Sequence, residues 1–128
     1  MFSDIFTGIE KHKKFHNGNE ILVKVKPVVD IYETDNSIVI LTEMPGVRKE
    51  DLRVSVKDGI LTISGKRQIV NIDGEYLMRE SSDVMYERAF ELEDNLDQEK
   101  IDASYSGGIL KVKISKKEEI KPRQIDIN

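Results

Sequence analysis

The sequence of 128 residues contains no cysteine, no tryptophan and only two histidines. Without cysteine the chain can form no disulfide and has neither a thiol nucleophile nor a thiolate metal ligand, which is compatible with a reducing compartment such as the cytoplasm. His12 and His16 could share one face of a helix, but no third ligand stands near them. We therefore expect neither a metal nor a cofactor.

The sequence also lacks a long apolar run, an excess of basic residues and a glycine-rich phosphate loop. A transmembrane helix needs roughly 18 or more apolar residues in succession, and the first residues lack the basic-then-apolar order of a secretory signal. The formal net charge is −4, concentrated in the central part of the chain, which argues against nucleic acid as a partner. We expect a cytoplasmic protein that is not an enzyme and makes no stable membrane insertion.

Hydrophobic residues make up 38% of the chain and fall into regular patterns, enough for a single core. The clearest pattern is LRVSVKDGILTISGK, residues 52–66, in which apolar and polar residues alternate on both sides of Asp58-Gly59. Both central residues of a type I′ turn need positive φ, which glycine takes freely and aspartate tolerates. The pattern predicts a β-hairpin that pairs Lys57 with Ile60 and has one apolar face.

Further strands are predicted on both sides of this hairpin. Residues 28–33 and 37–44 read as an antiparallel pair, residues 75–80 as a short strand and residues 86–92 as a stronger one. Residues 97–100 could form one helical turn, and a second hairpin turns at Gly107-Gly108. Arg88 lies on an otherwise apolar face and needs a carboxylate partner or an edge position. Short strands with frequent turns predict an all-β fold, an antiparallel β-sandwich.

The two ends of the chain carry apolar residues outside the strands. Phe2, Ile5, Phe6 and Ile9 are spaced to share one side of a short helix, which would be either a frayed terminus or an adhesive apolar arm. Near the other end, Ile125 and Ile127 would present two side chains to the same face of an extended segment. Such a segment could add to a sheet edge of another subunit or finish the sheet of its own domain.

Four motifs in order resemble the small heat-shock proteins of the α-crystallin family. They are EMPGVRKEDLRVSV at residues 43–56, RAF at residues 88–90, ASYSGGIL at residues 103–110 and the terminal I-x-I. The resemblance covers residues 28–128 and implies an immunoglobulin-like sandwich at residues 28–115, an arm at residues 1–27 and a C-terminal extension at residues 116–128. It also implies an ATP-independent holdase that binds unfolding client proteins and assembles from dimers into larger homo-oligomers.

The resemblance assigns roles to particular residues. The segment Tyr76, Leu77, Met78, Arg79 and Glu80 looks like the strand that such proteins exchange into the partner's sheet, beside the strand at residues 28–33. Ile125 and Ile127 look like a plug for a neighbouring subunit, and Arg88 looks like the family's arginine on the strand after the exchange loop. The client-binding surface is expected on Phe2, Ile5, Phe6 and Ile9.

The chain departs from the family pattern at Ser81, Val84, Glu93 and Ser115, where the family often has Arg, Gly, Pro and Pro. These departures leave open the course of the loop at residues 81–85. A second class of function is a co-chaperone module of the p23 type, which shares the sandwich and docks on a folded chaperone. The tryptophan-containing signatures of that class are absent here, whereas the apolar arm and the I-x-I favour a self-assembling holdase.

Overall fold

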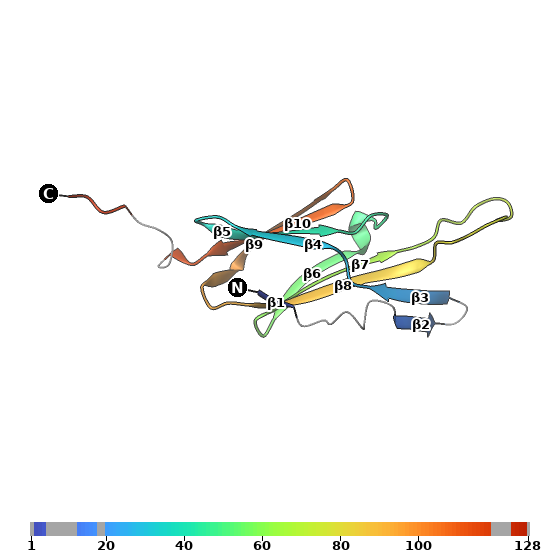
Figure 1. Cartoon of the computed structure of the whole chain (residues 1–128), viewed down its shortest axis with the longest axis horizontal. Coiled ribbons are helices and arrows are strands. Elements are labelled where there is room, and N and C mark those ends of the chain that lie inside the picture. Colours follow the sequence, from blue (N-terminus) through green and yellow to red (C-terminus); the bar gives the residue numbers. More distant parts are fainter. Residues whose placement is uncertain (1, 5–12, 18–19, 119–123, 128) are drawn as a thin grey trace.

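Two β-sheets pack face to face in this structure, a computed structural model that describes residues 2–4, 13–17, 20–118 and 124–127 (Figure 1). The first sheet has the order β2-β3-β8-β7-β6, with β1 also paired to β8; the second has the order β4-β5-β10-β9. The bounds in the first sheet are β1 Phe2–Asp4, β2 Lys13–Asn17, β3 Glu20–Val25, β6 Leu52–Lys57, β7 Ile60–Arg67 and β8 Asp83–Leu92. Those in the second are β4 Val29–Glu33, β5 Ser37–Glu43, β9 Leu96–Ser106 and β10 Ile109–Lys116. The predicted antiparallel β-sandwich is confirmed.

The hairpin of β6 and β7 has the predicted register. Lys57 pairs with Ile60, and both turn residues have positive φ, 52° at Asp58 and 75° at Gly59. A single 3-10 turn, η2 (Lys49–Asp51), leads into β6. Turn chemistry and alternation were therefore enough to place this part of the chain.

The second sheet also follows the predicted pairs. β4 pairs with β5 and β9 pairs with β10, the latter across Gly107-Gly108, whose φ values are 58° and 79°. The Thr34 hydroxyl oxygen accepts the N–H groups of Asn36 and Ser37 and so closes the β4–β5 turn. The helical turn expected at residues 97–100 is wrong, because β9 already begins at Leu96 and its pairing with β10 reaches that residue.

The core lies between the two sheets. Its members come from the inward-facing positions of the middle strands: Ile38, Ile40, Leu61, Ile63, Phe90, Val112 and Ile114 are at most 2% exposed. Leu52, Val54, Val56, Ile101 and Tyr105 pack against this cluster but are only half-buried. They come from β6 and β9, the outer strands on one side of the sandwich.

The segment that precedes β4 contributes strands rather than the expected helix. Phe2–Asp4 is β1 and pairs antiparallel with Leu92 to Phe90 of β8, so the helix is wrong for these residues, whereas Ile5, Phe6 and Ile9 lie outside the described residues. β2 pairs with β3, and β3 runs parallel to β8, with Leu22 opposite Asp83. The missed signal in the sequence was the dipeptide Gly18-Asn19, a turn-forming pair that stands shortly before the β-branched residues of β3.

Residues 68–82 form a long exposed loop between β7 and β8 that projects beyond the sandwich (Figure 1). The strand expected at residues 75–80 is not formed within the subunit, because none of the described strands pairs with this segment. Among the described residues, no helix has the length and apolar character needed to cross a membrane.

Candidate functional site

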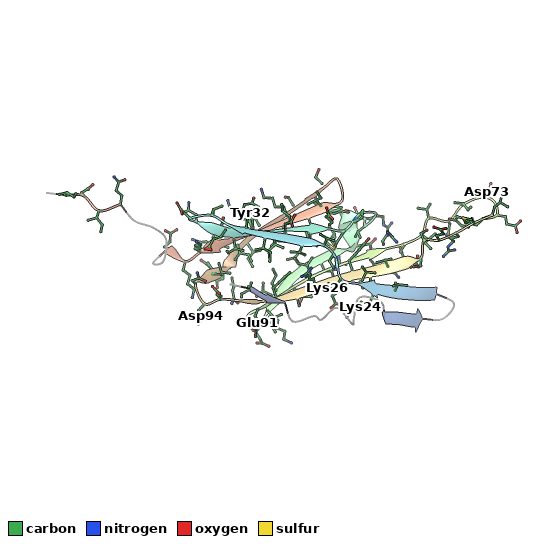
Figure 2. The ribbon with its side chains drawn as sticks, in the orientation of Figure 1. Lys24, Lys26, Tyr32, Asp73, Glu91 and Asp94 are labelled. Atoms are coloured by element: carbon green, nitrogen blue, oxygen red, sulfur yellow. The ribbon has the colours of Figure 1, made fainter. Side chains whose placement is uncertain are left out.

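The loop at residues 68–82, which we call the exchange loop, exposes apolar side chains. Leu77 is 99% exposed and Met78 77%, and Val70, Ile72 and Tyr76 are exposed as well. Figure 2 shows Asp73 at the tip, away from the sandwich. Soluble proteins seldom leave such a group of apolar side chains in water unless the surface has a partner.

The base of the exchange loop is held by polar contacts. The Asp83 carboxylate accepts the N–H of Ile69 at 2.7 Å and so joins the outgoing and returning limbs. Arg67 donates to the carbonyl of Ser82 at 3.3 Å, and to the hydroxyl of Tyr86 at 3.4 Å. These contacts fix the direction in which the loop leaves the sandwich, and with it the course of residues 81–85.

Within the loop, contacts are local and exposed. The Tyr76 hydroxyl donates to the carbonyl of Val70 at 3.3 Å, and the Arg79 guanidinium lies 5.5 Å from the centre of the Tyr76 ring. Arg79 also donates from Nε to the carbonyl of Ser81 at 3.2 Å. Leu77 and Met78 gain no burial from this arrangement.

The outer strand β4 offers a second exposed surface. It forms one edge of its sheet, and Figure 2 labels Tyr32 on it. Ile31 and Tyr32 are 37% and 45% exposed. Among the described residues, no strand pairs with its outer side. An unprotected edge of this kind presents free N–H and C=O groups to another chain.

Arg88 is half-buried on the inner strand β8, and a main-chain carbonyl accepts a hydrogen bond from its guanidinium. Its Nη1 donates to the carbonyl of Pro27 at 2.8 Å, and its guanidinium lies 5.5 Å from the ring centre of Phe90. Arg88 therefore ties β8 to the linker between β3 and β4, next to the edge strand. The structure brings Arg88 close to β4 but not to the exchange loop of the same subunit.

The tail is exposed where it is described. Ile125 and Ile127 are 77% and 96% exposed, and residues 124–127 form no strand. The alternative that these isoleucines finish the sheet of their own domain is therefore wrong for this structure.

The side of the sandwich opposite β4 has half-buried apolar positions. The short linker at residues 26–28 places β3 and β4 on one side, and the strand orders then place β6 and β9 together on the other. The inward-facing, half-buried residues of these two strands form what we call the β6–β9 edge: Leu52, Val54, Val56, Ile101 and Tyr105. Incomplete burial of this edge leaves apolar surface for further side chains.

Tyr105 closes one end of this edge. Its hydroxyl is 2.8 Å from the carbonyl oxygens of both Met44 and Val47, to which it donates across the Pro45-Gly46 turn. Burial of the phenol raises the pKa of Tyr105 above 10.0, and the nearby Tyr86 adds to this rise. Sequence reasoning missed this role, because one tyrosine in an alternating strand does not reveal which carbonyls it will meet.

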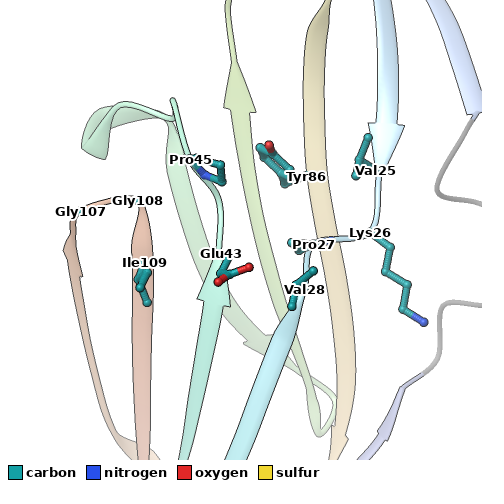
Figure 3. A pocket seen from close by; sticks show the side chains of 10 residues that line it. All are labelled: Val25, Lys26, Pro27, Val28, Glu43, Pro45, Tyr86, Gly107, Gly108 and Ile109. Carbon is teal, nitrogen blue, oxygen red and sulfur yellow. The ribbon is translucent and has the colours of Figure 1, made fainter. Parts of the chain in front are cut away.

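A cavity of about 480 Å³ lies at the end of the sandwich where β4 begins (Figure 3). It is lined mainly by apolar side chains and glycines, and Lys26 and Glu43 are the charged residues among its lining. These residues include no nucleophile beside a general base, and the described residues contain no cluster of three or more potential metal ligands. The notable surfaces are thus the exchange loop, the β4 edge, the β6–β9 edge and the tail.

These surfaces define a class of protein: an immunoglobulin-like β-sandwich with unpaired apolar extensions. The "Hsp20/alpha crystallin family" matches residues 30–128, and the chain belongs to this family of small heat-shock proteins. It is 45% identical over 91 residues to the heat shock protein HSP.16.4 of Streptococcus thermophilus, a match that covers 68% of this chain and 63% of that protein. It is 34% identical to the small heat shock protein C4 of Rickettsia felis, over 100% of this chain and 78% of the other.

Solved structures of small heat-shock proteins have the same fold as this chain. A small heat-shock protein from Xylella fastidiosa, described as having a distinct high order structure, superposes with a TM-score of 0.63 at 31% identity, over 80% of this chain and 95% of the other. Heat shock protein 16.0 from Schizosaccharomyces pombe gives 0.63 at 30% identity, over 81% and 99%. The sandwich is therefore an α-crystallin domain.

Proposed function

We propose that this protein is an ATP-independent holdase, which binds unfolding proteins and prevents their aggregation. The observation that carries the proposal is the contrast between a tightly packed sandwich and extensions that expose leucine, methionine and isoleucine. Unfolding proteins present irregular apolar surface, so a binder for them needs adaptable apolar groups more than a shaped catalytic pocket. The relatives named above are heat-shock proteins and give no support to the p23-type alternative.

The proposed building block is a dimer joined by strand exchange. Residues 76–80 of one subunit add to the free edge of β4 in the other, where main-chain hydrogen bonds provide affinity. The exposure of Leu77, Met78, Ile31 and Tyr32 supports this pairing, because each would lose contact with water in the dimer.

Dimers then associate through the tail. Ile125 and Ile127 of one subunit are proposed to enter the β6–β9 edge of a neighbour, whose apolar positions are only half-buried. The contact is small, but it repeats around a closed assembly, so its total effect on the particle is large.

Client binding is assigned to the N-terminal apolar residues Phe2, Ile5, Phe6 and Ile9. The pairing of Phe2–Asp4 with β8 involves three residues, which makes it a short and weak attachment. Release of this segment on heating would expose its apolar side chains to clients. Under this proposal the segment is a binding arm rather than a frayed terminus.

The test is aggregation of a heat-labile enzyme, followed by light scattering, with and without ATP. We expect the full chain to suppress aggregation equally in both conditions, and a variant without residues 1–9 to protect less at equal subunit concentration. Far-UV circular dichroism checks that the sandwich of the variant is intact. Equal protection by the truncated chain would contradict the role of the arm, and no protection by either chain would overturn the holdase proposal.

A further inference from the structure

The direction of the exchanged strand follows from where the exchange loop leaves the sandwich. The loop projects from the end at which β4 begins, so two copies related by a two-fold axis face each other through this end (Figure 1). The limb at residues 76–80 runs from the tip back to its own subunit, and therefore away from the partner. The partner's β4 runs from the facing end into the partner. The two segments are thus antiparallel.

The register follows from side-chain chemistry, because residues opposite each other in an antiparallel pair are in direct contact. One register places Leu77 opposite Tyr32, Met78 opposite Ile31 and Arg79 opposite Asp30, so that apolar residues meet apolar residues and opposite charges meet.

Every neighbouring register fails. A shift of one or two residues in either direction puts Leu77 or Met78 opposite Asp30 or Glu33, and burying an apolar side chain against a carboxylate removes water from the charge without a partner. The order of apolar and charged residues in β4 and in the exchange loop therefore favours this register over the four antiparallel registers shifted by one or two residues.

The charges of the β4 edge support the same register. Among the described residues, Asp30 makes no ion pair within its subunit, whereas the Glu33 carboxylate lies 3.2 Å from Nζ of Lys116. A parallel arrangement could bring Arg79 to Glu33 with Leu77 opposite Ile31, but that carboxylate is already paired. Pairing with Asp30 would cost Arg79 only its exposed contacts with Ser81 and Tyr76 in its own loop.

We propose that Arg79 of each subunit forms an ion pair with Asp30 of the other, and that Met78 and Leu77 pack on the partner subunit's Ile31 and Tyr32. This assignment rests on the proposed strand exchange and adds its direction, its register and the residues that make it specific for a second copy of this chain. The two-fold symmetry creates the ion pair twice in each dimer.

The test is a charge swap in the full-length chain. The variants Arg79→Glu and Asp30→Arg each place like charges opposite each other at both symmetric positions, and we expect each alone to weaken dimer association about tenfold or more. Mixing the two single variants allows a heterodimer in which both symmetric pairs join opposite charges, and the double variant Arg79→Glu with Asp30→Arg restores both pairs within a homodimer. Both the mixture and the double variant should dimerise with near-native affinity. Lys113→Glu, a charge reversal at an exposed position of the middle strand β10 of the same sheet, is the control and should not change association.

Each result decides the question. Weak dimers for both single variants and strong dimers for the double variant would support the assignment. No rescue in the double variant, with assembly still lost when residues 73–82 are deleted, would overturn the register and leave strand exchange standing. Rescue of Arg79→Glu by Glu33→Arg instead of Asp30→Arg would show the parallel arrangement and overturn the antiparallel one. Unchanged assembly after the deletion would overturn both the register and the proposed exchange.

Discussion

The same residue types have opposite environments in two regions of this molecule. In the sandwich, Leu61 and Ile63 are 0% exposed, whereas Leu77 in the exchange loop and Ile127 in the tail are 99% and 96% exposed. The difference lies in the available partners: a middle strand of the sandwich meets two neighbours and a facing sheet, whereas the described parts of the extensions face water. Burial within the subunit thus stabilises the fold, and the apolar side chains outside the sandwich stay exposed, as the proposed contacts with other subunits and clients require.

The comparison predicts that extensions and sandwich can be altered separately. Substitutions in the extensions should change particle size without changing the free energy of unfolding of the sandwich. Substitutions at buried polar positions of the sandwich should change the free energy of unfolding without changing particle size.

Deleting residues 73–82 should have the largest effect on assembly. The deletion removes the whole segment proposed to pair with the partner's β4, including its main-chain hydrogen bonds, so we expect monomers by sedimentation velocity at micromolar concentration. Circular dichroism should still show the sandwich, because no core residue lies in the deleted segment. A deletion variant that remains dimeric would contradict strand exchange.

The double substitution Ile125→Ala with Ile127→Ala should have the next largest effect. Burying two isoleucines contributes roughly 3–6 kcal/mol per contact before ordering costs, so its loss should release dimers from larger particles. Asp126→Ala between them is the matched control and should leave the particle mass unchanged. Light scattering with mass detection makes the comparison, and an unchanged mass for the double variant would refute the role of the tail.

Local patterns predicted most of the sandwich, because its hairpins are fixed by neighbours in sequence. Asp58-Gly59 and Gly107-Gly108 determined both turns, and alternation then determined which side chains face the core. The parallel pairing of β3 with β8 joins residues about 60 positions apart, and no local pattern reports it.

The candidate surfaces were only partly predictable. The exchange segment and the tail were assigned from the resemblance. The position of Asp30 on an edge strand and the hydrogen bond between Asp83 and Ile69 depend instead on how distant strands pack. The N-terminal spacing of three and four favoured a helix, but at Phe2–Asp4 the open edge of β8 supplies hydrogen-bond partners and a strand forms instead.

Tyr105→Phe should lower stability without changing assembly. The substitution leaves the carbonyls of Met44 and Val47 without this donor, at a cost of about 1–2 kcal/mol in the free energy of unfolding. Tyr32→Phe, on the exposed face of β4, is the control for loss of a hydroxyl and should be nearly neutral. Urea denaturation measures the free energy of unfolding of both variants. Equal stability of Tyr105→Phe and the parent would show that the hydrogen bonds of the Tyr105 hydroxyl to Met44 and Val47 contribute nothing.

The same tyrosine predicts a pH dependence. Its pKa is higher in the folded state than the ordinary 10.0, so the folded protein holds the proton more tightly than the unfolded chain. The corresponding stability is present below about pH 10 and is lost as pH rises through the folded-state pKa. The stability difference between the parent and Tyr105→Phe should therefore shrink above pH 10; a difference that stayed constant would contradict the raised pKa.

Thr42→Val should have the smallest effect and the opposite sign. Thr42 is 0% exposed and its Oγ1 is buried with no hydrogen-bond partner among the described residues. Replacing an unsatisfied hydroxyl with a methyl group of similar size removes a desolvation cost, so the free energy of unfolding should rise by about 1 kcal/mol. Thr62→Val, on the half-exposed outer face of β7, is the control, because water already satisfies a hydroxyl there. Thermal unfolding should show a rise of about 3–5 °C for Thr42→Val alone, with unchanged particle mass. If Thr42→Val lowers the unfolding temperature, the hydroxyl has a bound water as its partner, and this position belongs with the satisfied polar groups of the core.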